Sequence, residues 1–220
     1  MNVKREEMTF ETRLANRAVI YRSELDYLRQ CILERPNIET GGQLFGFWTR
    51  QGVAVVLFVL GPGPKANHQV AFFNQDLDYL VQVGGALVSR YGLSHIGEWH
   101  SHHQLGLAQP SGHDAETMSS VIRERNLGRF LMALGNCTPT EATVNAFEFT
   151  QANGANFRPI PWDVKEFKSP FRELIEKDLG MGGTGGMGAV GGIGATDSEG
   201  PEEASASDSV LNKSMNKEGE

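Results

Sequence analysis

Residues 97–116 read GEWHSHHQLGLAQPSGHDAE, and this segment joins the end of a predicted strand to the start of a predicted helix. Apolar alternation predicts the strand at 93–102, and helical spacing predicts the helix at 112–126. Ser111 stands where a helix N-cap is expected, and Asp114 follows at the third helical position, the spacing of a capping box. The sequence therefore predicts a strand end that faces the start of a helix.

Three side chains of this segment form a candidate metal site. Side chains two apart on a strand point to the same face, so His100 and His102 should present two imidazoles side by side. The helix start that lies opposite would bring the Asp114 carboxylate to them as a third ligand. Two histidines and one carboxylate leave a tetrahedral zinc ion one position for water, as in catalytic sites. This ligand set favours zinc, although the sequence does not exclude another divalent ion.

Neighbouring residues offer alternatives to this ligand set. His103 and His113 are each able in principle to replace a neighbour as ligand. Strand alternation turns His103 away from the metal face, and helical geometry rotates His113 about a hundred degrees from Asp114. We therefore expect a minor role for both. Trp99 alternates to the face opposite His100 and is expected to be a core residue.

The rest of the chain predicts strands mixed with helices. Strands are expected at 43–48 and 53–60, joined as a hairpin, and at 130–134, 144–149 and 157–160. Helices are expected at 23–35, 76–91 and 163–179. Ser23 is expected to cap the first of these helices, and Pro170 interrupts the last. In the second helix, one side carries Leu77, Leu80, Val81, Leu87 and Val88. This pattern predicts an α+β fold, an α/β sandwich in which a curved mixed sheet packs against helices.

Composition divides the chain of 220 residues into one domain, 1–179, and a tail, 180–220. Nine of the fifteen residues 180–194 are glycine, and no aromatic residue follows Gly180. Such a segment cannot bury enough surface to offset its ordering entropy, so we expect a disordered tail, glycine-rich and then acidic. The tail holds a charge of about −5 of the total of −7, and the domain is therefore close to neutral.

Charge and hydropathy exclude several classes of protein. The acidic balance argues against a nucleic-acid partner, which usually requires a basic surface. No apolar run approaches the length of a membrane span, and the charged N-terminal segment is unlike a signal peptide, so we expect a cytoplasmic protein without membrane contact. Cys31 and Cys137 match neither a disulfide framework nor a thiolate zinc site, and we expect both to be buried small hydrophobic residues.

The pattern of these residues resembles the JAMM metalloproteases, the catalytic branch of the MPN-domain family. That family combines a distant glutamate with His-x-His, a loop and Ser-x-x-Asp, and here Glu39 opens the matching segment ETGGQLFG. The chain departs from the family in having His103 where proline is usual and a loop to Ser111 that is one residue longer. The resemblance implies a cytidine-deaminase-like fold in which His100, His102 and Asp114 bind zinc.

The resemblance also implies an activity and partners. Glu39 would act as general base, and Ser111 would steady the tetrahedral intermediate. Catalytic family members cleave peptide or isopeptide bonds at the C-terminus of ubiquitin or ubiquitin-like proteins, which bind as an extended strand at a sheet edge. Because the chain lacks long insertions, it looks like a compact prokaryotic, deubiquitinase-like member, which acts beside ubiquitin-like activating and conjugating enzymes.

Two other functions remain open on sequence. The first is a non-catalytic MPN scaffold, which keeps the fold but has usually lost a metal-site residue. The second is a metal-dependent amidohydrolase with a substrate that is not ubiquitin-like. The site residues do not separate the second from the protease, because the metal site sets the reaction class and the surrounding loops choose the substrate.

Overall fold

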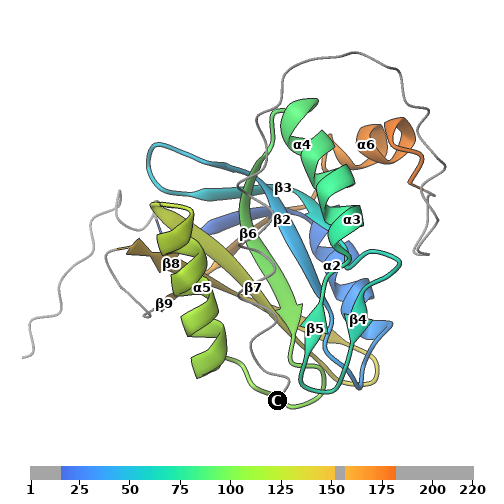
Figure 1. Cartoon of the computed structure of the whole chain (residues 1–220), viewed down its shortest axis with the longest axis vertical. Coiled ribbons are helices and arrows are strands. Elements are labelled where there is room, and N and C mark those ends of the chain that lie inside the picture. Colours follow the sequence, from blue (N-terminus) through green and yellow to red (C-terminus); the bar gives the residue numbers. More distant parts are fainter. Residues whose placement is uncertain (1–15, 152–156, 182–220) are drawn as a thin grey trace, which may run out of the picture.

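A computed structural model describes residues 16–151 and 157–181 of the chain (Figure 1). The predicted disordered tail, 180–220, lies outside the described residues except for Gly180 and Met181. These two follow the last helix, where Gly180 has a positive φ of 64° and the N–H of Met181 donates to the carbonyl oxygen of Glu176. Met181 packs against the hydrophobic core.

The centre of the fold is an eight-stranded mixed sheet with the order β10-β1-β3-β2-β6-β7-β8-β9. Its strands are β1 (Ala18–Tyr21), β2 (Gly41–Trp48), β3 (Ala54–Leu60), β6 (Ser94–Ser101), β7 (Arg129–Cys137), β8 (Ala142–Thr150), β9 (Phe157–Ile160) and β10 (Trp162–Lys165). Strand β1 pairs in parallel with β10 and β3, and β6 pairs in parallel with β7. A separate hairpin consists of β4 (Asn67–His68) and β5 (Phe73–Asn74).

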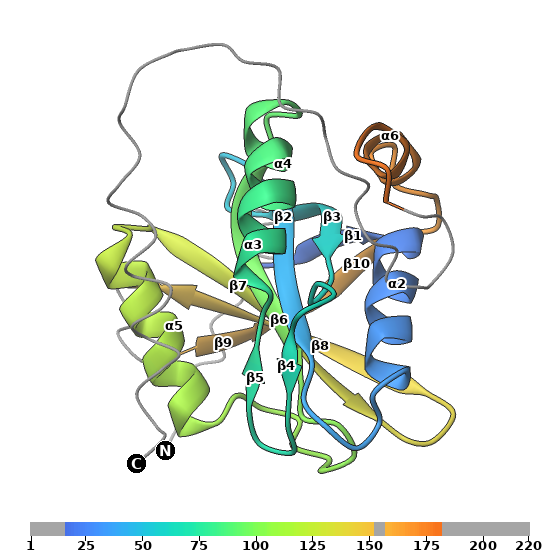
Figure 2. The same ribbon diagram turned by 45° about the vertical axis from the view of Figure 1, so that its right-hand side comes forward.

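Helices pack on both faces of this sheet (Figures 1 and 2). One face is covered by α2 (Arg22–Leu33); the other is covered by α5 (Gly112–Glu124) and by a helical segment composed of α3 (Leu77–Tyr79), the π-helical turn η1 (Leu80–Gly84) and α4 (Gly85–Ser89). The last helix, α6 (Arg172–Asp178), packs into the same apolar cluster as α4. The predicted α+β sandwich is confirmed.

Strand alternation divides the core between the two faces of the sheet. On β7, Leu131 and Ala133 pack with α2, whereas Phe130 and Met132 pack with α5. Trp99 is only 1% exposed, and its indole N–H donates to the carbonyl oxygen of Leu60. The expectation that Trp99 anchors the core is therefore confirmed. Both faces of the strands that lead to the candidate site are thus fixed by packing.

The predicted helix at 76–91 forms, but its apolar side is partly wrong. Asp76 caps it by accepting the N–H of Tyr79. Leu80 and Leu87 are buried, whereas Leu77, Val81 and Val88 are exposed, at 37%, 59% and 51%. The reason is the choice of face: the buried residues Leu80, Val83 and Leu87 have the spacing of one helical face, and the three exposed residues lie on the adjacent side of the helix.

Two other helix predictions need correction. Residues 163–165, the start of the expected C-terminal helix, instead belong to strand β10, because they pair in parallel with β1, a partner far away in sequence. The expected cap of the first helix is also wrong. The helix begins at Arg22 directly after β1, and the Ser23 hydroxyl instead accepts the N–H of Ser169.

A buried ion pair fixes α6 to the sheet. Glu24 is fully buried and accepts the N–H of Val59, while Arg172 hydrogen-bonds Glu24 and the carbonyl oxygen of Val59. The guanidinium also stacks over the rings of Tyr27 and Phe58, at 4.2 and 4.0 Å. Because every partner is present, neither charge is left uncompensated.

The prediction of two buried cysteines is correct for only one of them. Cys31 is buried as expected, whereas Cys137 is partly exposed at the end of β7, so that expectation was wrong for Cys137; both thiols are free. Among the described helices, none is sufficiently long and apolar to cross a membrane.

Candidate metal centre

The two predicted histidine ligands converge at the end of β6. His100 is held on both sides, opposite Gly41 of β2 and Leu134 of β7. His102 follows one residue beyond the strand, and its N–H donates to the carbonyl oxygen of Gly135. The two Nε2 atoms lie 3.2 Å apart. The strand register therefore presents two imidazole nitrogens to one point in space.

Asp114 reaches this point from the start of α5. Ser111 and Asp114 form a capping box in which the Ser111 N–H donates to the Asp114 Oδ2 at 2.7 Å and the Asp114 N–H donates to the Ser111 Oγ at 3.2 Å. This box fixes the carboxylate with its Oδ1 3.3 Å from the Nε2 of His100 and its Oδ2 3.3 Å from the Nε2 of His102.

The spacing of these three groups fits a tetrahedral cation. Zinc binds histidine nitrogen and carboxylate oxygen at about 2.0–2.2 Å, so two ligand atoms of a tetrahedron should lie about 3.3–3.5 Å apart. The two histidine nitrogens lie 3.2 Å apart, and each lies 3.3 Å from a different oxygen of Asp114. With one ligand atom taken from each residue, all three lie within 4.8 Å of one another, so a small adjustment of the carboxylate would complete the spacing. No other group of three or more such residues in the described part of the chain gathers its ligand atoms in this way. The residues present therefore form a site that a metal ion can occupy.

A hydrogen bond behind the ligands fixes one imidazole. The Nδ1 of His102 lies 3.3 Å from the carbonyl oxygen of Leu107, which also accepts from the Nδ2 of Asn136 at 2.9 Å. A carbonyl partner requires a hydrogen on Nδ1 and leaves Nε2 as the free electron pair. His102 is thus held in the tautomer that a metal ligand needs.

Glu39 lies beside the cluster and is positioned by the β4–β5 hairpin. Its N–H donates to the carbonyl oxygen of Gln69 at 2.8 Å, and its own carbonyl oxygen accepts from the Nδ1 of His68 at 3.0 Å. Its side chain lines a cavity together with His100 and Asp114. The hairpin stands next to the end of β6 (Figure 2).

The paired glycines after Glu39 allow this close approach. A Cβ atom on Gly41 would lie 2.7 Å from both the Phe73 ring and the carbonyl oxygen of Trp99. A Cβ atom on Gly42 would lie 2.0 Å from the carbonyl oxygen of Leu60. A side chain at Gly41 would push β2 away from β6, and one at Gly42 would push β2 away from β3. Either change would disturb the position of Glu39 relative to the histidines.

The charges of the cluster shift the pKa values of its members. Burial opposes ionisation of Asp114, but hydrogen bonds from His100 and His102 outweigh it and hold its pKa well below the ordinary value. Burial also opposes the charged form of His100, yet Asp114 raises the pKa of His100. Burial raises the pKa of Glu39, although the histidine charges oppose this shift. A carboxylate with a raised pKa is suited to accept a proton from water near neutral pH.

The other predicted residues take different positions. Ser111 is exposed at the edge of the cluster, where its hydroxyl caps α5. His103 lies outside the three-residue cluster; it has a positive φ of 38°, and its Nε2 hydrogen-bonds the carbonyl oxygen of Val70. His113 is exposed at the rim of the cavity. The structure thus brings together His100, His102 and Asp114, with Glu39 beside them; the catalytic roles stay predictions.

Sequence reasoning missed Glu98, which lines the same cavity. Burial raises the pKa of the Glu98 carboxyl to about 7. Its place on β6, two residues before His100, was a signal, because alternation puts both side chains on one face of the strand. It also missed the β4–β5 hairpin, whose strands of two residues each are too short for a periodic pattern.

His95 provides a pH-dependent contribution to stability near this cavity. Its Nε2–H donates to the Oε1 of Gln43, and burial lowers its pKa to about 4. As the pH falls from 6.5 to 4, the unfolded chain gains a proton here and the folded chain does not, so folding loses up to about 3 kcal/mol.

The matched variant His95→Gln keeps a donor for Gln43 but cannot titrate. We expect the unfolding free energy of the wild type minus that of the variant to fall by up to about 1.4 kcal/mol for each pH unit below 6.5, because only the wild type loses stability through residue 95. Urea unfolding at pH 6.5, 5.5 and 4.5 in the presence of chelator measures this difference. The opposite pH dependence of Glu98 is common to both proteins and cancels. A difference that does not change with pH would contradict the prediction.

The sequence resembles a known protein over part of its length. No family model matches the sequence. The chain is 28% identical over 94 residues to a protein named probable metalloprotease y4qB from Sinorhizobium fredii, an alignment that covers 40% of this chain and 54% of the relative. The chain therefore spans about half the length of this relative.

A solved structure shows the same type of fold. The solution structure of protein DSY2949 from Desulfitobacterium hafniense matches with a TM-score of 0.51 and 14% sequence identity, over 70% of this chain and 97% of that one. At this level of identity the likeness concerns the fold alone.

Proposed function

We propose that this chain is a zinc-dependent peptidase or isopeptidase of the JAMM type. The observation that carries the proposal is the convergence of His100, His102 and Asp114, whose ligand atoms lie within 4.8 Å of one another, with Glu39 beside them as a carboxylate outside the ligand set. The similarity to a probable metalloprotease supports the same reaction class. Zinc is favoured by the two nitrogen ligands and one oxygen ligand.

The chain's own residues supply the proton transfers. When bound, zinc acts as a Lewis acid that lowers the pKa of water to about 7. Glu39 accepts the proton of the attacking water and then donates it to the departing amine. The Ser111 hydroxyl accepts the N–H of Asp114 through a lone pair, so its own hydrogen is free to bond the developing oxyanion of the substrate.

The hairpin beside the site suits an extended substrate. Among the described strands, β4 and β5 pair only with each other, so each has a second edge whose backbone groups can pair with another strand. We propose that the substrate is the C-terminal segment of a ubiquitin-like protein, which binds in extended form along this hairpin. Ubiquitin-like activating and conjugating enzymes would then be its functional partners.

The test combines metal analysis with cleavage of defined fusions. The full chain is purified, its zinc content is measured, and it is incubated with ubiquitin-like proteins that end in Gly-Gly and carry a C-terminal peptide extension. We expect close to one zinc per chain and cleavage after the last glycine, which stops with 1,10-phenanthroline and returns with added zinc. A matched set of linear peptides without the ubiquitin-like domain serves as the control.

Each other outcome selects a different function. If the protein binds no zinc and cuts no substrate, the enzyme proposal is contradicted and the non-catalytic scaffold remains. Zinc binding with cleavage of the linear peptides alone would contradict the ubiquitin-like substrate and leave a metallopeptidase of broader use.

A further inference from the structure

A cavity of about 140 Å³ opens beside the candidate metal centre. It begins at Glu39, His100 and Asp114 and extends between α5 and the β4–β5 hairpin. An engineered protein cavity of about 150 Å³ holds one benzene molecule, so this space suits one side chain of a substrate. It is too small for more than one side chain.

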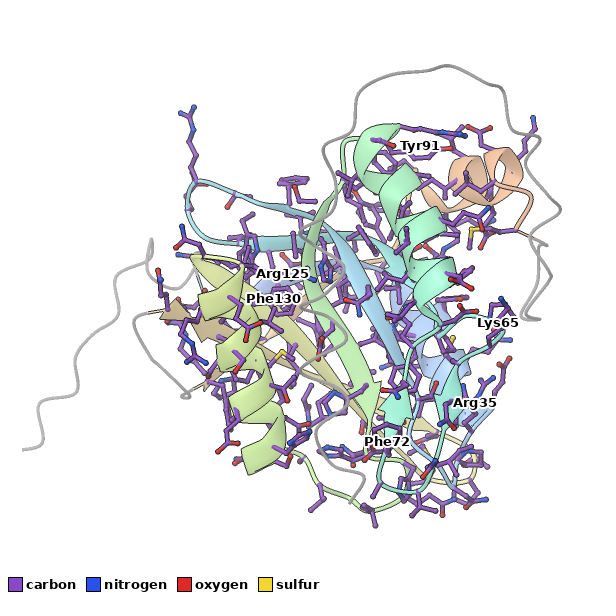
Figure 3. The ribbon with its side chains drawn as sticks, viewed as in Figure 1. Arg35, Lys65, Phe72, Tyr91, Arg125 and Phe130 are labelled. Atoms are coloured by element: carbon purple, nitrogen blue, oxygen red, sulfur yellow. The ribbon has the colours of Figure 1, made fainter. Side chains whose placement is uncertain are left out.

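The walls of the cavity are apolar on two opposite sides. Phe72 and Phe73 line it from the hairpin, and Met118 and Val121 line it from α5. Figure 3 shows Phe72 beside β5, and Arg125 and Phe130 near the C-terminal end of α5. A side chain with an aliphatic stem would bury that stem between these walls, which is favourable at about 25 cal/mol per Å².

Two of the polar side chains that line the cavity are paired with each other. The amide of Gln43 donates to Gln75 and accepts from His95, and the amide of Gln75 donates to the carbonyl oxygen of Gly61. Glu98 also lines the cavity, and among the described residues its carboxyl has no hydrogen-bond partner. This carboxyl is therefore available to accept from a ligand that brings a donor, and a charged donor would give the stronger hydrogen bond.

The Glu98 carboxyl favours a cationic donor. Asp114 and Glu39 lie at the mouth of the cavity, but a bound zinc ion would offset their charge, so Glu98 is the carboxyl of the cavity that the metal centre leaves for a ligand. Arg125 is near enough for its charge to act on Glu98, but it contacts the Nδ1 of His95 at 3.5 Å, and no ion pair within 4.0 Å joins it to Glu98 in the described chain. An anionic group at Glu98 would be repelled.

We propose that this cavity binds an arginine or lysine side chain of the substrate, with its stem between Phe72 and Met118 and its cationic end at Glu98. The inference rests on the proposed function, because it assigns Glu98 as a specificity-determining residue of the same site. It adds a sequence requirement, a basic residue next to the scissile bond, that the metal ligands do not impose.

The first experiment measures binding without turnover. The zinc-loaded full chain is titrated with n-propylguanidinium and, separately, with N-propylurea, a neutral compound of nearly the same shape. Amide signals are followed by NMR at residues 97–99 and 118–121. Guanidinium stays protonated at neutral pH and so does not compete as a zinc ligand. We expect guanidinium to bind at least about tenfold more tightly than urea, since a hydrogen bond to a charged group is strong.

Variants locate the bound cation. Glu98→Gln should weaken guanidinium binding by about tenfold or more, whereas Glu124→Gln, an exposed carboxyl on the same helix as Met118, should leave it unchanged. Val121→Trp, which fills the cavity but keeps Glu98, should also remove binding. Equal affinity for urea and guanidinium, or unchanged binding in Glu98→Gln, would overturn the proposal. Loss in Glu39→Gln alone would place the cation at the metal centre and overturn it as well.

A second experiment separates this inference from the proposed function. The fusion substrates are prepared with arginine, lysine, citrulline or leucine at each position next to the scissile bond. We expect kcat/KM for arginine to exceed that for citrulline at least about tenfold in wild type and to lose this advantage in Glu98→Gln. Cleavage with no such preference would contradict the cavity assignment and leave the protease. Guanidinium binding without cleavage of any substrate would contradict the protease and leave the cavity.

Discussion

Asp114→Asn is expected to abolish zinc binding and activity while the fold remains intact. Asparagine can keep the capping box, because its side-chain oxygen still accepts the N–H of Ser111. It removes the negative charge that lies 3.3 Å from both His100 and His102. Loss of a residue that only hydrogen-bonds a metal ligand costs about 10–100-fold in metal affinity, and the loss of a direct ligand should cost more.

The measurement is zinc affinity by competition with a chromogenic chelator, together with the thermal midpoint of the metal-free protein. Ser111→Ala is the matched control: it removes the helix cap, at a cost of about 1 kcal/mol, but keeps all three ligand atoms. We expect Ser111→Ala to bind zinc with near wild-type affinity and to melt at a lower temperature. Unchanged zinc affinity in Asp114→Asn would show that the carboxylate is not a ligand.

Glu39→Gln is expected to lose cleavage but to retain its zinc content, unlike Asp114→Asn. Glutamine has nearly the same shape, and the backbone of residue 39 stays fixed by its bonds to Gln69 and His68. Glutamine cannot accept the proton of the attacking water. General-base catalysis contributes about 10²–10⁴-fold, and we expect kcat to fall by that factor with little change in KM.

Glu116→Gln, an exposed carboxyl on α5, is the control for a loss of negative charge near the site. The cleavage rate and the zinc content of both variants are measured on the same preparation. Wild-type turnover in Glu39→Gln would remove the general-base assignment. Loss of zinc in this variant would instead make Glu39 a ligand, and the water would need another base.

The candidate ligands were predictable because their geometry is local. A strand places residues two apart on one face, so the relation of His100 to His102 needs no knowledge of the rest of the fold. The capping box likewise sets Asp114 relative to Ser111 within three residues of sequence. Glu39 is different, because nothing local links it to the histidines. Its place followed from a family resemblance, and the structure puts it beside them through the pairing of β2 with β6.

Two of the failed predictions share a non-local cause. Residues 163–165 were expected to be helical and become part of a strand because β1 offers them an open edge. Ser23 is an ordinary cap candidate in sequence, but β1 leads directly into α2 and the hydroxyl accepts a hydrogen bond from Ser169. In both cases the deciding contact joins segments more than 130 residues apart, which periodicity within a short window does not detect.

By itself, then, the sequence determined the kinds of element and the residue types at the candidate metal site, because backbone periods and capping spacings act over a few residues. Tertiary structure alone decided that β2 brings Glu39 to that site, that a short hairpin stands beside it, and that Glu98 lines a cavity without a hydrogen-bond partner among the described residues. Those features depend on which strands pair and which side chains are shielded from water. Such relations arise only when segments distant in sequence pack together.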